Sequence, residues 1–183
     1  MTYYGSKELA AAFRTVRNNT ITIAEEIPEE HYGFRITPDT RTVGETLVHI
    51  AVMCRVPQMI HFERGLTSLE GFNFFEVMGG LIAEQQVPRS KQQIIDMLRN
   101  SGEVFAKQLE GASEEFLGQI VKYPAGMMPP TKSRFEMLMS AKEHEMHHRG
   151  QLMMMERMLG IVPHLTRQMM ERIAAMQASK AGA

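Results

Sequence analysis

SRFEMLMSAKEHEMHHRGQLMMMERML, residues 133–159, is the stretch that decides the fold. It holds one glycine, no proline and mostly strong helix formers, so it predicts one long helix. Ser133 and Glu136 form an S-x-x-E capping box at its start, and Gly160 follows its end. At 100° per residue, one face collects residues at spacings of four and three, and this face is expected to meet a core. That face consists of Met137, Ala141, His144, His148, Leu152, Met155 and Leu159.

Three further stretches predict long helices, each with one apolar face. Capping boxes open the second of the four, with Thr42 and Glu45, and the third, with Ser90 and Gln93. Pro57 lies inside the second helix and should kink it, because proline lacks the N–H that the helix needs there. The three stretches span residues 6–27, 42–64 and 90–111.

The connections between these helices add little regular structure. Residues 65–89 are rich in glycine and phenylalanine, and they serve either as a lid or pocket wall or as the crossover that a bundle needs. Short helices are expected near residues 113–120 and 166–177. No stretch alternates apolar and polar residues, so no strand is predicted. Residues 1–183 are therefore expected to form a single all-α domain, a four-helix bundle with short additional helices.

Composition favours a soluble protein of the cytoplasm. Hydrophobic residues make up 44% and charged residues 22% of the chain, and the formal net charge of −1 comes with no basic cluster, which argues against a nucleic-acid partner. The single cysteine, Cys54, has no partner for a disulfide within the chain and favours a reducing compartment. No apolar run approaches the ~20 residues of a membrane span, and the first residues lack a signal-peptide core.

Three of the seven histidines fall on predicted core faces. His144 and His148 lie one helical turn apart, about 6 Å, and His49 lies on the inward face of the second helix. A single core histidine is usually structural, but three buried neutral imidazoles without nearby carboxylates lack acceptors for their N–H groups. We therefore interpret His49, His144 and His148 as ligands of one divalent metal ion. Three histidine ligands leave a coordination position open, which is typical of catalytic sites.

The other four histidines are expected outside this group. His31 and His164 fall in connections and should face solvent. His61 lies about 120° around its helix from His49, and His147 should point to the edge of the long helix's core face or into an interface.

Residues 144–148 also match H-E-x-x-H, in which Glu145 would be the general base of a zinc metalloprotease. The extended form of that motif fails, because Gln151 and Met154 stand where glycine and histidine are required. No predicted strand is available to hold a peptide in extended form. A metalloprotease is therefore the minor alternative.

Two segments resemble the DinB superfamily: H-E-M-H-H-R-G-Q-L at residues 144–152 and T-V-G-E-T-L-V-H-I-A at residues 42–51. The resemblance covers nearly the whole chain and implies a four-helix bundle of up-down-down-up topology, often a homodimer, with a divalent metal held by three histidines. Carried over position by position, those ligands are His49, His144 and His148. Related proteins include transferases and isomerases that use a low-molecular-weight thiol such as bacillithiol or mycothiol, and many other members have no demonstrated activity.

The sequence thus favours a metal-dependent thiol transferase or hydrolase that acts on a small molecule, with zinc or nickel ahead of iron or copper as the metal. Glu145 and Arg149 flank the histidines and could orient a ligand or anchor an anionic substrate, although exposed helix charges are the commoner explanation. The alternative is a non-catalytic metal-binding or structural protein, which a fourth protein ligand would favour. Apolar surface on the second helix and on the Met-rich end of the long helix predicts a homodimer.

Overall fold

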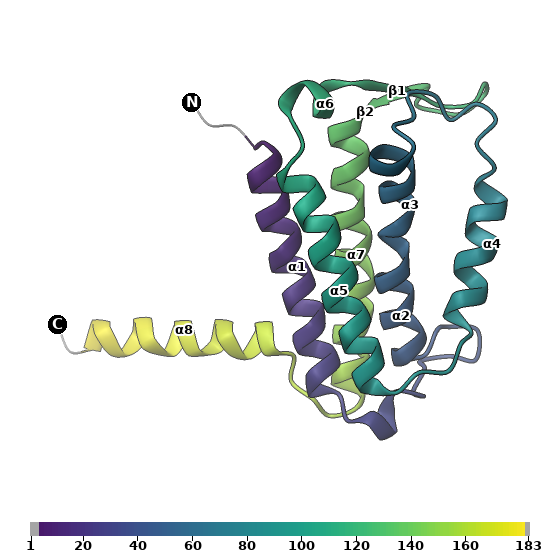
Figure 1. Cartoon of the computed structure of the whole chain (residues 1–183). Helices are drawn as coiled ribbons and strands as arrows, with labels where there is room; N and C mark the ends of the chain where they lie inside the picture. The colour runs from purple at the N-terminus through teal and green to yellow at the C-terminus, as the bar shows by residue number, and fades with distance from the viewer. Residues whose placement is uncertain (1–3, 182–183) are drawn as a thin grey trace.

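The computed structural model describes residues 4–181, and four long helices form its bundle (Figure 1). Around the bundle, neighbouring helices contact one another in the order α1, α5, α2, α7 and back to α1. α1 and α7 run in one direction and α2 and α5 in the other, which is the expected up-down-down-up topology. The four helices are α1 (Ser6–Glu26), α2 (Val43–Met53), α5 (Lys91–Glu110) and α7 (Arg134–Met158).

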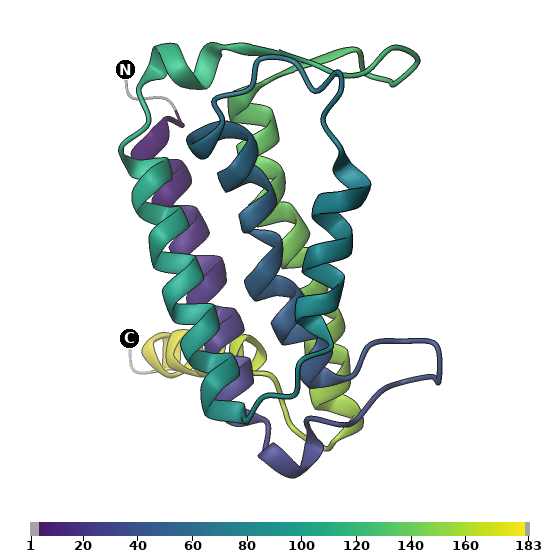
Figure 2. The same ribbon diagram turned by 45° about the vertical axis from the view of Figure 1, so that its right-hand side comes forward.

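Shorter elements join and extend the bundle. α4 runs along the outer side of α2 and is the crossover that returns the chain to the start of α5 (Figure 2). Within residues 4–181, no helix is long and apolar enough to cross a membrane. The shorter elements are η1 (Glu29–His31), α3 (Arg55–Pro57), η2 (Gln58–Glu63), α4 (Phe74–Gln85), α6 (Glu114–Gly118), β1 (Ile120–Lys122), β2 (Thr131–Ser133) and α8 (His164–Ala181).

Local sequence signals set the helix boundaries. At the start of α2, the hydroxyl of Thr42 accepts from the backbone N–H of Glu45 at 3.1 Å, and the Glu45 carboxylate accepts from the N–H of Thr42 at 2.7 Å. The capping boxes that open α5 and α7 are formed as well, so all three predicted boxes are confirmed. Pro57 also acts as expected: α2 ends at Met53, and the chain continues through α3 into the π-helical turn η2.

The structure departs from the sequence prediction at two places. β1 and β2 form an antiparallel pair centred on Val121 and Lys132, although no strand was predicted. Strands of three residues are too short to show an alternating pattern. α8 begins at His164 rather than near Thr166, continues to Ala181, and projects away from the bundle (Figure 1).

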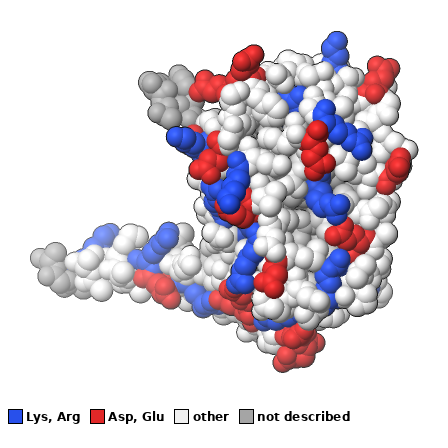
Figure 3. Space-filling model, in the orientation of Figure 1, with Lys and Arg blue, Asp and Glu red and all other residues white. Residues whose placement is uncertain are grey.

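Apart from a small third cluster of Ile60, Leu69 and Val121, two apolar clusters form the core, one above the other along the bundle. Between them lies a buried ion pair of Arg17 and Glu145, and their side chains are 3% and 2% exposed. On the outer face, by contrast, charges alternate in sign over α1 and α5 (Figure 3), where Arg14 pairs with two glutamates. The largest buried apolar side chains are Leu9, Phe13, Phe105, Leu109 and Leu138 in one cluster and Ile23, Ile27, Leu47, Ile50, Leu98 and Leu152 in the other.

Candidate metal centre

Three histidine side chains meet between α2 and α7. Nε2 of His49, on α2, lies 3.2 Å from Nε2 of His144 on α7, and Nε2 of His148 lies 3.1 Å from that same atom. The i, i+4 spacing of His144 and His148 puts both rings on the side of α7 that contacts α2, with ring planes at 76° to each other. The structure thus brings together the three histidines selected from the sequence, with one ring nitrogen of each within 4.8 Å of the others.

Two glutamine side chains fix which ring nitrogen of His49 and of His148 faces the centre of the histidine group. Oε1 of Gln85, on α4, lies 3.1 Å from Nδ1 of His49, while Nε2 of Gln85 donates to the carbonyl of Leu81. Because the amide nitrogen is already used as a donor, the amide oxygen accepts from Nδ1–H, and Nε2 of His49 keeps its lone pair. Oε1 of Gln151 accepts in the same way from Nδ1 of His148 at 2.8 Å.

The three imidazoles are neutral at physiological pH. Burial is the largest cause, and together with nearby positive charge it lowers the pKa of His49 to about 3 and the pKa of His144 to about 4. Burial also lowers the pKa of His148, although the hydrogen bond with Gln151 acts in the opposite direction. Neutral imidazole is the form that binds a metal ion.

This donor set fits a divalent transition-metal ion. Two of the three separations between Nε2 atoms, 3.1 and 3.2 Å, are close to the ~3.3 Å that a tetrahedral ion with Zn–N bonds of about 2.0–2.1 Å would impose. Converging lone pairs repel one another, and a cation at their centre relieves that repulsion. Among residues 4–181, no fourth His, Cys, Asp or Glu belongs to the group, so the described side chains leave a tetrahedral position open.

Glu145 lies in the core rather than on an exposed helix face, which corrects the sequence expectation. Its carboxylate accepts from Nε and Nη2 of Arg17 at 2.9–3.1 Å, and the residue is 1% exposed. Arg149 is half-buried, its Nε has no hydrogen-bond partner among the described residues, and burial lowers its pKa. The Glu145 carboxylate is therefore engaged by a guanidinium group rather than directed at the histidines.

Arg17 is the central polar residue that sequence reasoning missed. From α1 it donates to the carbonyl of Leu98 at 2.7 Å and to the hydroxyl of Ser101 at 2.9 Å, both on α5. Its Nη2 also lies 3.1 Å from Sγ of Cys54, just beyond α2. A Cβ atom at Gly102 would lie only 2.7 Å from Cγ of Arg17, so the glycine leaves the space that this side chain needs.

The other histidines lie outside the group of three. His147 is exposed and contacts Gln151, and His61 is buried with its Nδ1 3.0 Å from Nη1 of Arg134. His31 is partly exposed in η1. The prediction that His164 faces solvent is wrong: it is 5% exposed, with Nε2 3.2 Å from Oδ1 of Asn19, because the first turn of α8 packs against α1.

A family model for the DinB family matches residues 1–175. The chain belongs to the DinB family. Among solved structures, it is similar to the DinB-like protein YjoA from Bacillus subtilis, at 20% identity over 84% of this chain and 92% of that one, with a TM-score of 0.61. YfiT from Bacillus subtilis, described as a probable metal-dependent hydrolase with an unusual four-helix bundle topology, is 11% identical over 88% of this chain and 91% of YfiT, with a TM-score of 0.67. Both likenesses show the fold, and no curated protein matches the chain.

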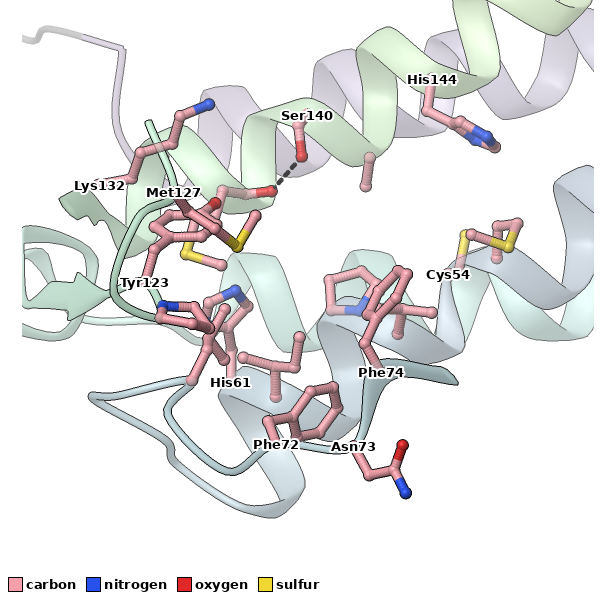
Figure 4. Close-up of a pocket in the computed structure, with 18 of the residues that line it drawn as sticks. Cys54, His61, Phe72, Asn73, Phe74, Tyr123, Met127, Lys132, Ser140 and His144 are labelled. Carbon is pink, nitrogen blue, oxygen red and sulfur yellow. Dashed lines mark hydrogen bonds between the residues drawn. The ribbon is translucent and has the colours of Figure 1, made fainter. Parts of the chain in front are cut away.

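In this DinB protein, a cavity of about 640 Å³ reaches the histidine group at His144 (Figure 4). Its walls come from α2, α3 and η2, the chain that leads into the first turn of α4, the loop after β1 with β2, and the first half of α7. Residues 65–89 therefore fulfil both roles left open by the sequence, because α4 is the crossover, and the segment before it lines the cavity together with the first turn of α4. The wall residues from that segment are Leu69, Phe72, Asn73, Phe74 and Phe75.

Proposed function

We propose that this protein is a metal-dependent enzyme that transfers a group to or from a small molecule, or hydrolyses it, at His49, His144 and His148. One observation carries the proposal: three neutral imidazoles bring one ring nitrogen each within 4.8 Å of the others, beside a cavity large enough for a substrate. Open coordination positions and an adjoining pocket are features of catalytic rather than structural metal sites.

The described side chains have separate parts in this proposal. A divalent ion held by His49, His144 and His148 would act as a Lewis acid and would make a bound water or thiol nucleophilic near neutral pH. Gln85 and Gln151 hold the rings of His49 and His148 with their lone pairs facing the ion. Apolar walls next to His144 exclude bulk water and strengthen the electrostatic interactions at the reacting group.

The metalloprotease alternative finds little support in this geometry. The general base of an H-E-x-x-H site must have a carboxylate free to take a proton. The Glu145 carboxylate instead accepts three hydrogen bonds from Arg17 in the core. The two-stranded sheet, β1 with β2, is three residues long in each strand.

The second candidate is a metal-binding protein without turnover, in which the histidines only hold α2 and α7 together. The absence of a fourth protein ligand among residues 4–181, and the cavity beside His144, favour the enzyme over this candidate. A small-molecule substrate is favoured over a polymer because the charges on the face in Figure 3 alternate in sign and form no basic track.

Elemental analysis of untagged protein purified without chelators tests the metal proposal and identifies the ion. Turnover is then measured with activated esters, and with electrophiles in the presence of bacillithiol or mycothiol, before and after metal removal. The enzyme proposal predicts turnover that metal removal abolishes and metal return restores. Metal-independent turnover, or full turnover in His148→Ala, would contradict it. Bound metal with no turnover in any assay would favour the non-catalytic candidate.

We also propose that the protein acts as a cytoplasmic homodimer. The apolar surface predicted on the second helix is covered by α4, α5 and α7 within the chain. Exposed apolar side chains gather instead at the end of α7 and on α8. They are Met154, Met158, Val162, Met169, Met170, Ile173 and Met176. A second copy that covers this surface would remove it from water.

A further inference from the structure

The cavity is elongated along α7, from the histidine group toward the β-hairpin. Figure 4 shows His144 at one end of the lining, and Tyr123 and Lys132 at the other. Arg134 is the first residue of α7 and His144 follows ten residues later (144 − 134 = 10), so a rise of ~1.5 Å per residue separates the two ends by about 15 Å. A molecule that fills this space must be extended.

The middle of the cavity is apolar. Apolar side chains from four parts of the chain line the cavity, and among them are Ile60, Phe72, Phe74, Met127 and Met137. Transfer of an alkyl or aromatic body from water to such walls is favourable in proportion to the apolar area buried. The lining therefore selects a ligand by its hydrophobic body.

Four other polar side chains of the lining are already paired within the protein. Glu145 binds Arg17, and His61 binds Arg134. The Ser140 hydroxyl donates to a backbone carbonyl at 2.6 Å, and the Asn73 side chain caps α4. None of these groups needs a ligand to complete its hydrogen bonds, so a polar group in the middle of a ligand would gain nothing there.

The end of the cavity near the hairpin differs in charge. Lys132 has no ion-pair or hydrogen-bond partner for its ammonium group among residues 4–181, and the nearby Glu136 carboxylate is held by Ser133. Tyr123 adds a hydroxyl at the same end (Figure 4). An ammonium and a hydroxyl beside apolar walls suit the anionic head of an amphiphile.

We propose that the substrate of this site is an extended hydrophobic molecule that carries an anionic group at one end. Its apolar body lies along α7, its anionic group meets Lys132 and Tyr123, and the bond that reacts lies at the other end, beside His144. The identity of the reacting end rests on the proposed function, whereas the binding of the body and of the anion rests on the cavity alone.

Binding is measured with straight-chain carboxylates of increasing length, from hexanoate to decanoate, by displacement of an apolar fluorescent dye. Each pair of added methylenes should tighten binding about tenfold until the cavity is filled. The same series is measured on metal-free His148→Ala protein, where it should be unchanged, because the lining does not depend on the metal. Failure of the metal proposal would leave this result intact, whereas affinity independent of chain length would overturn the inference.

Two adjacent methionines provide a matched pair of variants. Met127 lines the cavity and is 50% exposed, whereas Met128 is not among the lining residues and is 85% exposed. Met127→Glu should weaken decanoate binding at least about tenfold, because it places a second carboxylate at the Lys132 end of the cavity, where the anionic head is expected (Figure 4). Met128→Glu should bind within about twofold of the wild-type protein, since it adds the same charge outside the cavity. Equal effects of the two substitutions would place the carboxylates elsewhere on the protein.

Filling the cavity from a helix gives a second check. Ala141 lines it one turn before the end of the lining at Glu145, and Ala175 is exposed on α8. Ala141→Trp should abolish decanoate binding, and Ala175→Trp should leave it unchanged. If Ala141→Trp binds decanoate as the wild-type protein does, the cavity is not the site. Circular dichroism confirms that both variants are folded.

The role of Lys132 is tested by comparing the binding of an anionic ligand with that of an uncharged ligand of the same chain length. The wild-type protein should bind decanoate several-fold more tightly than 1-decanol, and Lys132→Met should bind the two equally. Equal binding of the two ligands by the wild-type protein would show that the site does not recognise an anionic group. Decanol binding itself should be unaffected by the substitution, because the apolar walls are unchanged.

Discussion

The amide oxygen of Gln85 lies 3.1 Å from Nδ1 of His49, and this contact joins the crossover helix α4 to the histidine group. Gln85→Leu should lower metal affinity about 10–100-fold, because the ring of His49 loses the partner that fixes its orientation and tautomer. Competition with a chelator of known affinity measures the effect. Gln86 is exposed at the end of the same helix, so Gln86→Leu is the matched control and should bind metal as the wild-type protein does. Unchanged affinity in Gln85→Leu would show that His49 is positioned without α4.

The adjacent residues His147 and His148 should respond differently to substitution. His148→Ala should lose most of the bound metal because Nε2 of His148 faces the centre, and the same is expected of His49→Ala and His144→Ala. His147→Ala should keep it, since His147 is exposed, its Nε2 contacts Gln151, and its ring lies edge-on to His148 outside the group of three. Metal content of each purified variant is the measurement. Loss of metal in His147→Ala with retention in His148→Ala would require the site to be rebuilt around the other face of α7.

The ion pair of Arg17 and Glu145 should be a large source of stability. Glu145→Ala leaves the Arg17 guanidinium buried and partly unpaired, so the free energy of unfolding should fall by about 3–5 kcal/mol. Urea unfolding measures this, with Glu25→Ala as the control. Glu25 forms an exposed pair with Arg99, and its loss should cost less than about 1 kcal/mol. Glu145→Gln should still bind metal stoichiometrically if Glu145 serves Arg17 rather than the metal.

Glu156 should make stability depend on pH. Burial, and then the charge of Glu26, raise the pKa of Glu156 from 4.5 to about 7, although Arg167 and Arg157 act against the shift. The folded protein therefore binds a proton more tightly than the unfolded chain, and this contribution is full below about pH 4.5 and is lost as the pH rises to about 7. Glu156→Gln removes the contribution, so its melting temperature relative to wild type should rise from pH 5 to pH 8.

The buried histidines contribute with the opposite sign, because burial lowers their pKa values and their effect appears as the pH falls below about 6.5. That effect is common to the wild-type protein and the variant, so the difference between the two isolates Glu156. A constant difference in melting temperature from pH 5 to pH 8 would contradict the assignment.

The proposed homodimer predicts a mass of about twice 20.8 kDa by light scattering. Ile173→Glu places a charge among the exposed apolar side chains of α8 and should shift the protein toward the monomer. Gln177→Glu, one turn further along α8, adds the same charge at an already polar position and should leave the mass unchanged. A monomer mass for the wild-type protein that does not depend on concentration would refute the dimer.

Much of the fold follows from local patterns that the sequence displays. The spacing of apolar residues predicts the four long helices, and the hydroxyl and carboxylate or amide pairs predict where three of them start. His144 and His148 could be placed together because both lie on one helix. His49 could be added because its helix also has a recognisable inward face.

The charged core could not be predicted in this way. Arg17, Arg134 and Glu145 are all buried, but a hydropathy pattern treats each of them as a solvent-facing residue. Their burial depends on partners brought by other helices, such as the carbonyl of Leu98 for Arg17. One signal was available, since Arg17 lies four residues after Phe13 on the apolar face of α1.

Of the two residues that orient the histidines, one could have been found from the sequence and the other could not. Gln151 lies three residues after His148, a spacing at which side chains on a helix meet, so it could have been found from the sequence. Gln85 comes from a crossover helix whose position against α2 is set by tertiary packing. No local pattern links it to His49.

The position of Arg17 has a consequence for how the protein unfolds. Its guanidinium group reaches Ile50 on α2, Leu98 on α5 and Glu145 on α7 from its own place on α1. A state in which one of these helices has detached would expose or strand a charge that the other three still enclose. We therefore expect the four long helices to open as a single cooperative unit, with native-state hydrogen exchange giving one common opening energy for their amides. α8, which lies outside that unit, should exchange its amide protons well before the bundle does.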